Sequence, residues 1–259
     1  LTEASTTTTR WNTNVFAAYN RLFGLHNLNF SLGFNATYSN ISYSYAHYRG
    51  FPDAHRHSPA YAYEIVTKPT FTDNKTRLFG VFLMMNYSYN DIYLADFSFR
   101  YDGSSEFGTD NKWAPFWSVG IGWNAHNESF LSDLGWFDIF RIRGSVGYTG
   151  SVNFSDYQAI TTYLYKQDNN YLISMGALPI TMGNDRLKWQ TTVKYNVGAT
   201  LEMWEGRLSA NFDIYKEDTK DLLLSISTPP SMGVTNVMDN LGETRNWGYE
   251  WSLSGLLIK

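Results

Sequence analysis

The stretch YLADFSFRYDGSSEFGTDNKWAPFWSVGIGW, Tyr93 to Trp123, decides the fold of this chain. In its first part, alternate positions carry Tyr, Ala, Phe, Phe and Tyr, and the positions between them carry Leu, Asp, Ser, Arg and Asp. After a polar loop, Trp117, Val119 and Ile121 alternate with serine and glycine. Alternation with a period of two over this length indicates strands whose two faces meet different surroundings, one apolar and one polar.

The same alternation recurs on both sides of this stretch, most clearly from Leu28 to Tyr38. The alternating runs extend about 10 to 14 residues, which exceeds the usual length in soluble sheets and approaches that of a tilted membrane-spanning strand. With the runs at 10–21, 75–89, 140–146, 187–203, 207–224 and 246–258, the pattern predicts about nine strands. Short turns alternate with longer loops at 40–74, 102–112, 149–186 and 225–245, which is typical of a transmembrane β-barrel. Around Ser129 to Leu134 we expect a helical turn.

The composition agrees with an all-β membrane protein. Of 259 residues, 17% are aromatic, 19 are tyrosines and only 17% are charged, a balance that suits strands and membrane interfaces. The net charge of −4 offers no basic surface for nucleic acid. The absence of cysteine excludes disulfides and thiolate metal sites. The sequence has no apolar run long enough for a spanning helix, and LTEASTTTTR has no signal-peptide pattern.

Four motifs carry a resemblance to a known family. The run RYDGSSEFG (Arg100 to Gly108), followed by SVGIGW, resembles a motif of the SusC/RagA-type TonB-dependent outer-membrane transporters. NDRLKWQTTVKYNVGAT (184–200), RLSANFDIYKEDTKDLLL (207–224) and NLGETRNWGYEWSLSG (240–255) resemble further motifs of that family, in the same order. The resemblance implies import of oligosaccharides or peptides across the outer membrane of Bacteroidetes-type bacteria. It also implies a SusD-like surface lipoprotein as a lid and energy from the TonB–ExbB–ExbD system.

The number of strands predicts that the chain is part of a larger barrel. An open sheet of about nine strands would leave two long edges, which hydrocarbon does not tolerate. Plugged transporters need about 22 strands. We therefore expect residues 1–259 to be an internal part of one barrel domain, without the plug domain, the TonB box and the terminal strands that the resemblance implies. The alternative is a soluble or surface-exposed β-rich binding protein without transport activity, which detergent dependence would distinguish.

No catalytic or metal site is predicted. The sequence contains none of the nucleophile, zinc-protease, phosphate-loop or dinucleotide motifs, so we expect no enzyme activity and no cofactor. His47, His55 and His57 are spaced to hold a metal, but a solvated loop is the favoured interpretation. The run from Asp102 to Asn111 lacks the spacing of a calcium-binding EF-hand loop, so a turn is favoured there.

Two sets of residues are candidates for function. Aromatic side chains on outside loops can stack on sugars or line a partner interface, although packing within the loop is an equal alternative. The candidates for ligand or lid contact are Tyr43, Tyr45, Tyr48, Phe51, Tyr61, Tyr63, Tyr163 and Tyr165. The long loops should not carry the wall, so we expect removal of residues 48–59 to leave the barrel folded.

Charged residues form the second set, because they fall on the polar side of the alternation. A charge facing hydrocarbon would cost several kcal/mol, so these groups should face a wet lumen or a plug, generic lumen polarity being the simpler alternative. The lumen-facing or plug-facing candidates are Asp96, Arg100, Arg141, Arg143, Lys194 and Asp213. The residues expected to contact outer-membrane lipids are Leu28, Phe30, Phe34, Phe97, Trp117, Ile121, Val193 and Val197.

Overall fold

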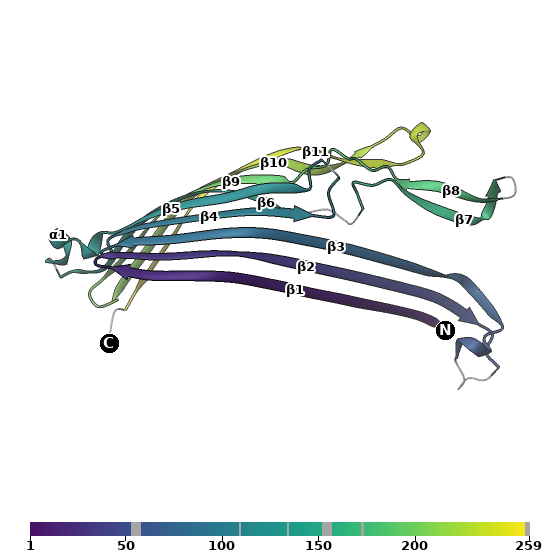
Figure 1. The fold of residues 1–259 in the computed structure, drawn as a ribbon, viewed down its shortest axis with the longest axis horizontal. Coiled ribbons are helices and arrows are strands. Elements are labelled where there is room, and N and C mark those ends of the chain that lie inside the picture. Colours follow the sequence, from purple (N-terminus) through teal and green to yellow (C-terminus); the bar gives the residue numbers. More distant parts are fainter. Residues whose placement is uncertain (53–57, 109, 134, 152–156, 172–173, 257–259) are drawn as a thin grey trace.

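A computed structural model describes residues 1–52, 58–108, 110–133, 135–151, 157–171 and 174–256. Its main element is one curved sheet in which every strand pairs antiparallel with its neighbours (Figure 1). The nine strands, in their order across the sheet, are β1 (Thr2–Phe23), β2 (His26–Arg49), β3 (Glu64–Tyr89), β4 (Tyr93–Ser104), β5 (Trp113–Asn124), β6 (Phe137–Ser151), β9 (Gln190–Met203), β10 (Leu208–Ser227) and β11 (Asn236–Gly255). The predicted all-β fold and the prediction of about nine strands in the wall are therefore confirmed.

The two ends of the sheet differ in how the strands are joined. At one end, here called the turn end, the β1–β2, β3–β4 and β9–β10 connections are tight, with left-handed backbone at Asn90 (φ 51°), Asp91 (φ 53°) and Glu205 (φ 57°). This end also carries the short helices η2 (Ala125–Asn127) and α1 (Ser129–Ser132), so the helical turn predicted there is confirmed (Figure 1). In the described part of the chain, no helix is long and apolar enough to cross a membrane.

At the other end, here called the loop end, the strands are longer than the sequence predicted. The segment 40–74 was expected to be a loop. Instead, β2 and β3 extend into it from both sides as far as Arg49 and Glu64, with Tyr43 opposite Thr72 and Tyr48 opposite Ile65. The face that carries Tyr38 continues with Ser42 and Ser44, whereas Tyr43 and Tyr45 lie on the other face, so the alternation of the wall does not continue in phase through this extension. The range 48–59, expected to be a loop that can be removed, begins inside a strand, because Tyr48 and Arg49 belong to β2.

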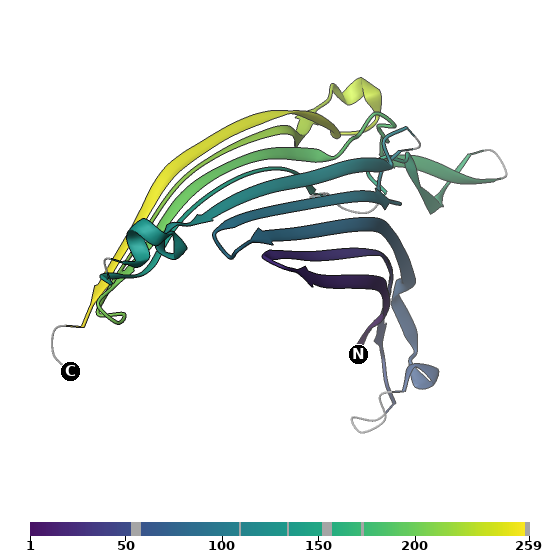
Figure 2. The same ribbon diagram turned by 60° about the vertical axis from the view of Figure 1, so that its left-hand side comes forward.

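The other predicted loops contain ordered structure as well. Within 149–186, the hairpin of β7 (Thr162–Tyr171) and β8 (Ser174–Thr181) forms a separate two-stranded sheet that projects beyond the wall (Figures 1 and 2). The segment 225–245 is mostly strand, because β10 and β11 extend into it around the short helix η3 (Pro230–Met232). A further helix, η1 (Pro59–Tyr61), lies at the tip of the β2–β3 connection.

The strand register divides the side chains between an apolar face and a polar face of the sheet. Phe97 lies opposite Met85 and Val119, Val119 lies opposite Val146, and Val146 lies opposite Tyr195. Followed along the strands, this register places all eight residues predicted to face lipid on the same face. All six predicted lumen residues lie on the other face, since Asp96 is in register with Gly120, Ser145 and Asn196.

Candidate functional site

Several charged residues of the polar face are held by other side chains of the sheet. Arg143 of β6 reaches across β9 to Asp213 of β10, with Nη2 at 2.7 and 2.8 Å from the two carboxylate oxygens. The strand between them carries Gly198, where a Cβ would collide with Asp213 Oδ1 and lie 2.7 Å from Arg143 Nε. Only glycine therefore lets this ion pair lie flat over the middle strand.

Arg100 of β4 also binds a carboxylate on the polar face, but its partner Asp102 belongs to the same strand. Its guanidinium contacts both carboxylate oxygens of Asp102, at 2.9 and 3.1 Å, and donates to Asn35 Oδ1 at 3.2 Å. Gly80 of β3 lies beneath this group, and a Cβ there would meet Asp102 Oδ1. A guanidinium bound to a carboxylate in this two-pronged geometry is fixed in position and largely neutralised.

The remaining candidates of the polar face differ in how far their charge is compensated. Lys194 Nζ lies 2.8 Å from Glu217 Oε1, directly across the β9–β10 pair. Arg141 Nε donates to the neutral amide of Asn124 at 2.6 Å, and within the described residues it has no carboxylate partner. Asp96 likewise makes no hydrogen bond or ion pair with the described residues; its nearest cross-strand neighbour is Gly120. Two charges of opposite sign, Arg141 and Asp96, thus remain available to an external partner.

The aromatic candidates occupy three separate places at the loop end. Tyr43, Tyr45 and Tyr48 are wall residues of β2 rather than loop residues, which corrects the sequence-based expectation. At the tip of the β2–β3 connection, Tyr61 and Tyr63 have exposed side chains, Tyr63 to 91%. Phe51 lies at the start of the same connection.

The third aromatic group sits on the projecting hairpin. Tyr163 and Tyr165 of β7 are 58% and 69% exposed, and they share a face with their cross-strand partners Pro179 and Ala177. In Figures 1 and 2, this hairpin and the β2–β3 tip project separately from the loop end. The eight aromatic candidates therefore do not form one site.

A tyrosine from the connection after β6 forms hydrogen bonds with backbone groups on the unpaired edge of β3. β4 ends at Ser104, so the outer part of β3 has no strand on that side. Tyr157 takes its place, since its hydroxyl accepts from Lys75 N at 3.2 Å and donates to Asp73 O at 3.3 Å. This part of β3 lies beyond the length that a tilted strand needs to span a membrane. There Lys75, together with a hydrogen bond from Ser42, holds the pKa of Asp73 below its ordinary value, and Asp73 in turn raises the pKa of Lys75.

Two of the motifs that carried the family resemblance meet in a small buried cluster on the polar side of the loop end. Phe107, from the first motif, stacks on Trp189, from the second, with ring centroids 4.6 Å apart. Phe116 packs edge-on against Trp189 at 5.3 Å, and all three side chains are buried. A Cβ at Gly108 would collide with the carbonyl oxygen of Asp185, so glycine allows the two segments to touch. These motif residues therefore join the β4–β5 connection to the segment before β9 at the loop end.

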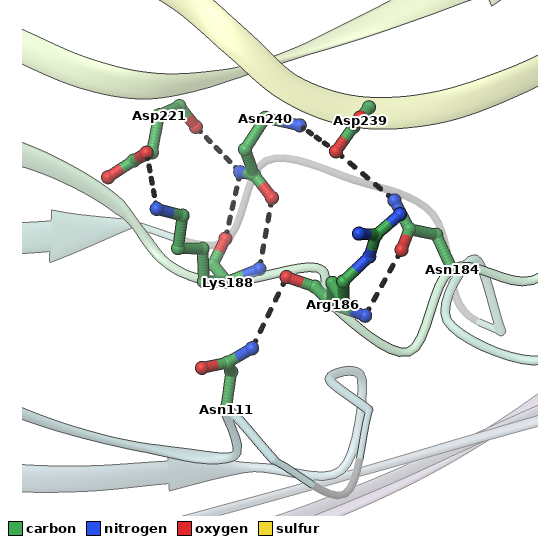
Figure 3. Close-up of polar contacts among 7 residues, drawn as sticks. All are labelled: Asn111, Asn184, Arg186, Lys188, Asp221, Asp239 and Asn240. Carbon is green, nitrogen blue, oxygen red and sulfur yellow. Dashed lines mark hydrogen bonds and ion pairs between the residues drawn. The ribbon is translucent and has the colours of Figure 1, made fainter.

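A second group of motif residues fastens the segment before β9 to β10 and β11, as Figure 3 shows. The Asn240 side chain accepts from Lys188 N at 3.0 Å and donates to Lys188 O at 3.0 Å and to Asp221 O at 2.7 Å. Asn184 donates to Met238 O at 3.1 Å and to Asp239 Oδ1 at 3.2 Å. We call residues 184–189 the strap. The strap is tied to strands that lie some fifty residues away in sequence.

Four residues of these contacts, Asn240, Asn184, Gly198 and Gly80, had no role predicted from the sequence. The two asparagines and Gly198 lie in the quoted motifs, and this was the one signal that could have identified the asparagines. The two glycines carried a weaker signal, since each interrupts a strand pattern at a position where another backbone or side chain approaches closely. What these residues contact depends on the strand register, which the motifs do not reveal.

The metal candidates do not form a site in the described part of the chain. No group of three or more His, Cys, Asp or Glu side chains converges there. His47 lies on β2, whereas His55 and His57 fall outside the described residues. In the second candidate region, the carboxylate of Asp102 is bound by Arg100.

Comparisons with known proteins agree with this architecture. A family model described as "TonB dependent receptor-like, beta-barrel" matches residues 2–257. The chain is 32% identical over 244 residues to TonB-dependent receptor P3 of Formosa agariphila, covering 92% of this chain and 24% of that protein. It is 33% identical over 187 residues to the TonB-dependent receptor SusC of Bacteroides thetaiotaomicron, covering 70% of this chain and 18% of that protein.

A solved structure of the RagAB peptide transporter superimposes over the whole chain, with a TM-score of 0.91 and 25% identity. The match covers 29% of the solved chain. This chain therefore spans about a quarter or less of the length of the curated relatives named above.

Proposed function

The chain belongs to the β-barrel family of TonB-dependent receptors, and we propose that it forms part of the wall of an outer-membrane importer for oligosaccharides or peptides. The observation that carries this proposal is the separation of the two faces. The eight apolar residues and the six charged residues that were predicted for the two sides lie on opposite faces of one continuous sheet. The family match disfavours the alternative of a soluble β-rich binding protein, and the proposed activity is transport rather than catalysis.

We assign the apolar face to lipid and the polar face to the lumen. The distribution of glycines supports this assignment, because Gly33, Gly80, Gly120, Gly198 and Gly248 lie on the polar face, against Gly103 and Gly144 on the apolar face. Small residues suit the inner side of a curved wall, where side chains are crowded, and charged groups avoid hydrocarbon there. The turn end then faces the periplasm and the loop end the outside, as short and long connections do in such barrels.

This chain contains no cysteine, so single cysteines can report on its two faces once any cysteine elsewhere in the receptor has been replaced. Single cysteines at Phe97 and at its neighbour Asp96 would be introduced into the full-length receptor and spin-labelled. In liposomes, the label at 97 should be accessible to oxygen dissolved in lipid, and the label at 96 should be accessible to a water-soluble nickel complex. The reverse pattern, or equal accessibility of both labels to the nickel complex, would contradict the proposal.

Among the charged residues, Arg141 is the strongest candidate for contact with a plug domain. Arg100 and Arg143 are already neutralised by Asp102 and Asp213 within the wall, whereas Arg141 has only the neutral partner Asn124 among the described residues. A cation left without a counter-charge can gain most from a carboxylate on a neighbouring domain. We expect crosslinks from position 141, rather than from positions 100 or 143, to reach plug carboxylates in the whole receptor.

A SusD-like surface lipoprotein is the proposed partner at the loop end. An isolated two-stranded hairpin is marginally stable in water, and the β7–β8 hairpin exposes apolar side chains on both faces. Leu164 and Leu178 pair on one face at 49% exposure each, opposite the face of Tyr163 and Tyr165. A partner that covers the hairpin would remove this apolar area from water. The tip residues Tyr61 and Tyr63 are candidates for the same lid or for the captured ligand.

The import function is tested with the whole receptor in its native host. A strain lacking the receptor gene would be compared with the wild type for growth on single oligosaccharides and on defined peptides as nutrient sources. A substrate-specific growth defect that a TonB-defective strain shares supports the proposal and identifies the ligand class. Normal growth on every substrate tested, with the receptor shown to be present in wild-type outer membranes, would contradict it.

A further inference from the structure

A cleft lies on the apolar face, near the loop end, and the proposed transport function assigns it no role. Its volume is about 480 Å³, and its aromatic and glycine lining comes from Trp11, Tyr38, Phe79, Gly103 and Trp113. Trp11 stacks on Tyr38 with centroids 5.7 Å apart, and Trp113 packs edge-on against Phe79 at 6.1 Å. A Cβ at Gly103 would lie 2.6 Å from the Trp113 ring, so glycine lets this indole lie flat against β4. The cleft is therefore an ordered, apolar groove with aromatic walls.

Two cations, Arg77 and Lys112, border this apolar groove. The guanidinium of Arg77 lies over the Tyr38 ring, 6.0 Å from its centroid. In the described residues, neither Arg77 nor Lys112 has a carboxylate partner. Elsewhere on the apolar face, Lys216 and Arg245 share Asp218 at 2.9 and 2.5 Å. The groove thus combines an apolar floor with two positive charges whose counter-ion the described part of the chain does not supply.

The height of the groove follows from the strand lengths. Tyr38 and Trp113 lie about 10 to 12 residues along their strands from the turn end, which is about 33–40 Å at about 3.3 Å per residue. With the usual tilt of about 40°, this corresponds to about 25–30 Å above the turn end. The apolar band of an outer-membrane barrel is about 25 Å tall, so the groove lies where acyl chains give way to headgroups of the outer leaflet.

We infer that this groove binds a phosphate-bearing membrane lipid, with one acyl chain against the aromatic walls and its phosphate between Arg77 and Lys112. The inference rests on the proposed function, because it requires the apolar face to lie in the membrane. Charge complementarity selects an anionic headgroup, and basic pockets beside an apolar surface bind such headgroups. The groove opens on the face assigned to lipid, which disfavours a soluble sugar as its occupant.

The test uses the purified full-length receptor in detergent, with retained lipids counted by native mass spectrometry. The lipids offered are phosphatidylglycerol, which is anionic, and phosphatidylcholine, which is zwitterionic. We expect phosphatidylglycerol to be retained preferentially. Arg77→Gln and Lys112→Gln should each weaken its binding by about fivefold, and together by about 25-fold, as expected for the loss of about one headgroup contact per cation. Lys220→Gln removes an exposed positive charge from β10, outside the groove lining, and should change nothing.

A second variant tests the acyl-chain part of the site. Trp113→Ala removes an aromatic wall and should weaken the binding of both lipids while the selectivity for phosphatidylglycerol is kept. Equal retention of the two lipids by the wild type, or unchanged phosphatidylglycerol binding by the double glutamine variant, would overturn the inference. Displacement of phosphatidylglycerol by inorganic phosphate alone would overturn it as well, since it would show a site for a free anion.

The two levels of proposal are separated by measuring membrane insertion and uptake beside lipid binding. A receptor that is embedded in the outer membrane and imports its ligand, but does not select phosphatidylglycerol, contradicts only the lipid site. A receptor absent from the outer-membrane fraction contradicts the proposed function. Heat-modifiability on a gel reports the folded barrel for each variant, so a loss of lipid binding with a retained folded band supports the site.

Discussion

Replacing Asn240 by alanine should release the strap (residues 184–189) while the barrel wall stays folded. The Asn240 side chain makes three hydrogen bonds to backbone groups, two with Lys188 and one with Asp221. Each such bond contributes about 1 kcal/mol net, and an unpaired backbone group costs more when water cannot reach it. Because Lys188 is exposed and water can replace part of the loss, we expect the free energy of local opening to fall by about 1–3 kcal/mol.

Hydrogen–deuterium exchange on the full-length receptor measures this opening directly. A loss of about 1–3 kcal/mol corresponds to roughly 5- to 150-fold faster exchange of amides in the strap, provided that they exchange by local opening. Asn240→Asp keeps the shape but places a carboxylate oxygen against two carbonyl oxygens and near Asp239, so it should be at least as disruptive as alanine. Asn236→Ala is the matched control, since this asparagine is exposed and its side chain bonds, among the described residues, only to its neighbour Thr235.

The outcome that refutes this reasoning is specific. Strap amides that exchange at the wild-type rate in Asn240→Ala would show that the three hydrogen bonds do not hold the segment. A uniform rise in exchange across β9, β10 and β11 would show that Asn240 stabilises the wall rather than the strap. In either case, the role assigned to the Asn240 motif would be wrong.

Three further predictions concern the wall and the lid. Gly198→Ala should cost about 1–3 kcal/mol of barrel stability, because the new Cβ overpacks the ion pair that crosses this strand; Gly120→Ala, where the nearest atom lies at 3.6 Å, should be tolerated, and equal denaturant midpoints for the two variants would contradict the reasoning. Phe34→Arg should destabilise the barrel by about 2–4 kcal/mol in liposomes if it faces the middle of the membrane, whereas Phe34→Leu should cost much less; a neutral arginine variant would place this face in water. Tyr163→Ser combined with Tyr165→Ser should weaken capture of the surface lipoprotein in a pull-down without changing the heat-modifiable band, and undiminished capture would remove the hairpin from the lid interface.

The sequence alone determined the wall of this protein. Period-two alternation is a local property, because successive side chains of a strand point to opposite faces wherever the strand is placed. It therefore assigned Phe97 and Val193 to one face and Asp96 and Arg143 to the other, and the register agrees. The motifs likewise indicated the family, because they depend only on which residues follow one another along the chain.

Only the tertiary structure decided the lengths of the strands and the side-chain contacts at the loop end. In the extension of β2, Tyr43 and Tyr45 lie on the face opposite to Tyr38, so the apolar stripe of the wall breaks off and the pairing with β3 continues the strand. Asn240 and Lys188 are 52 residues apart, and their contact exists because the register of β9, β10 and β11 brings them together. Arg143, which the alternation predicts only as an inward charge, meets the carboxylate of Asp213 through the pairing of strands, whereas Arg100 meets Asp102 within its own strand. Pairing between distant strands is set by the whole sheet, and no single stretch of sequence encodes it.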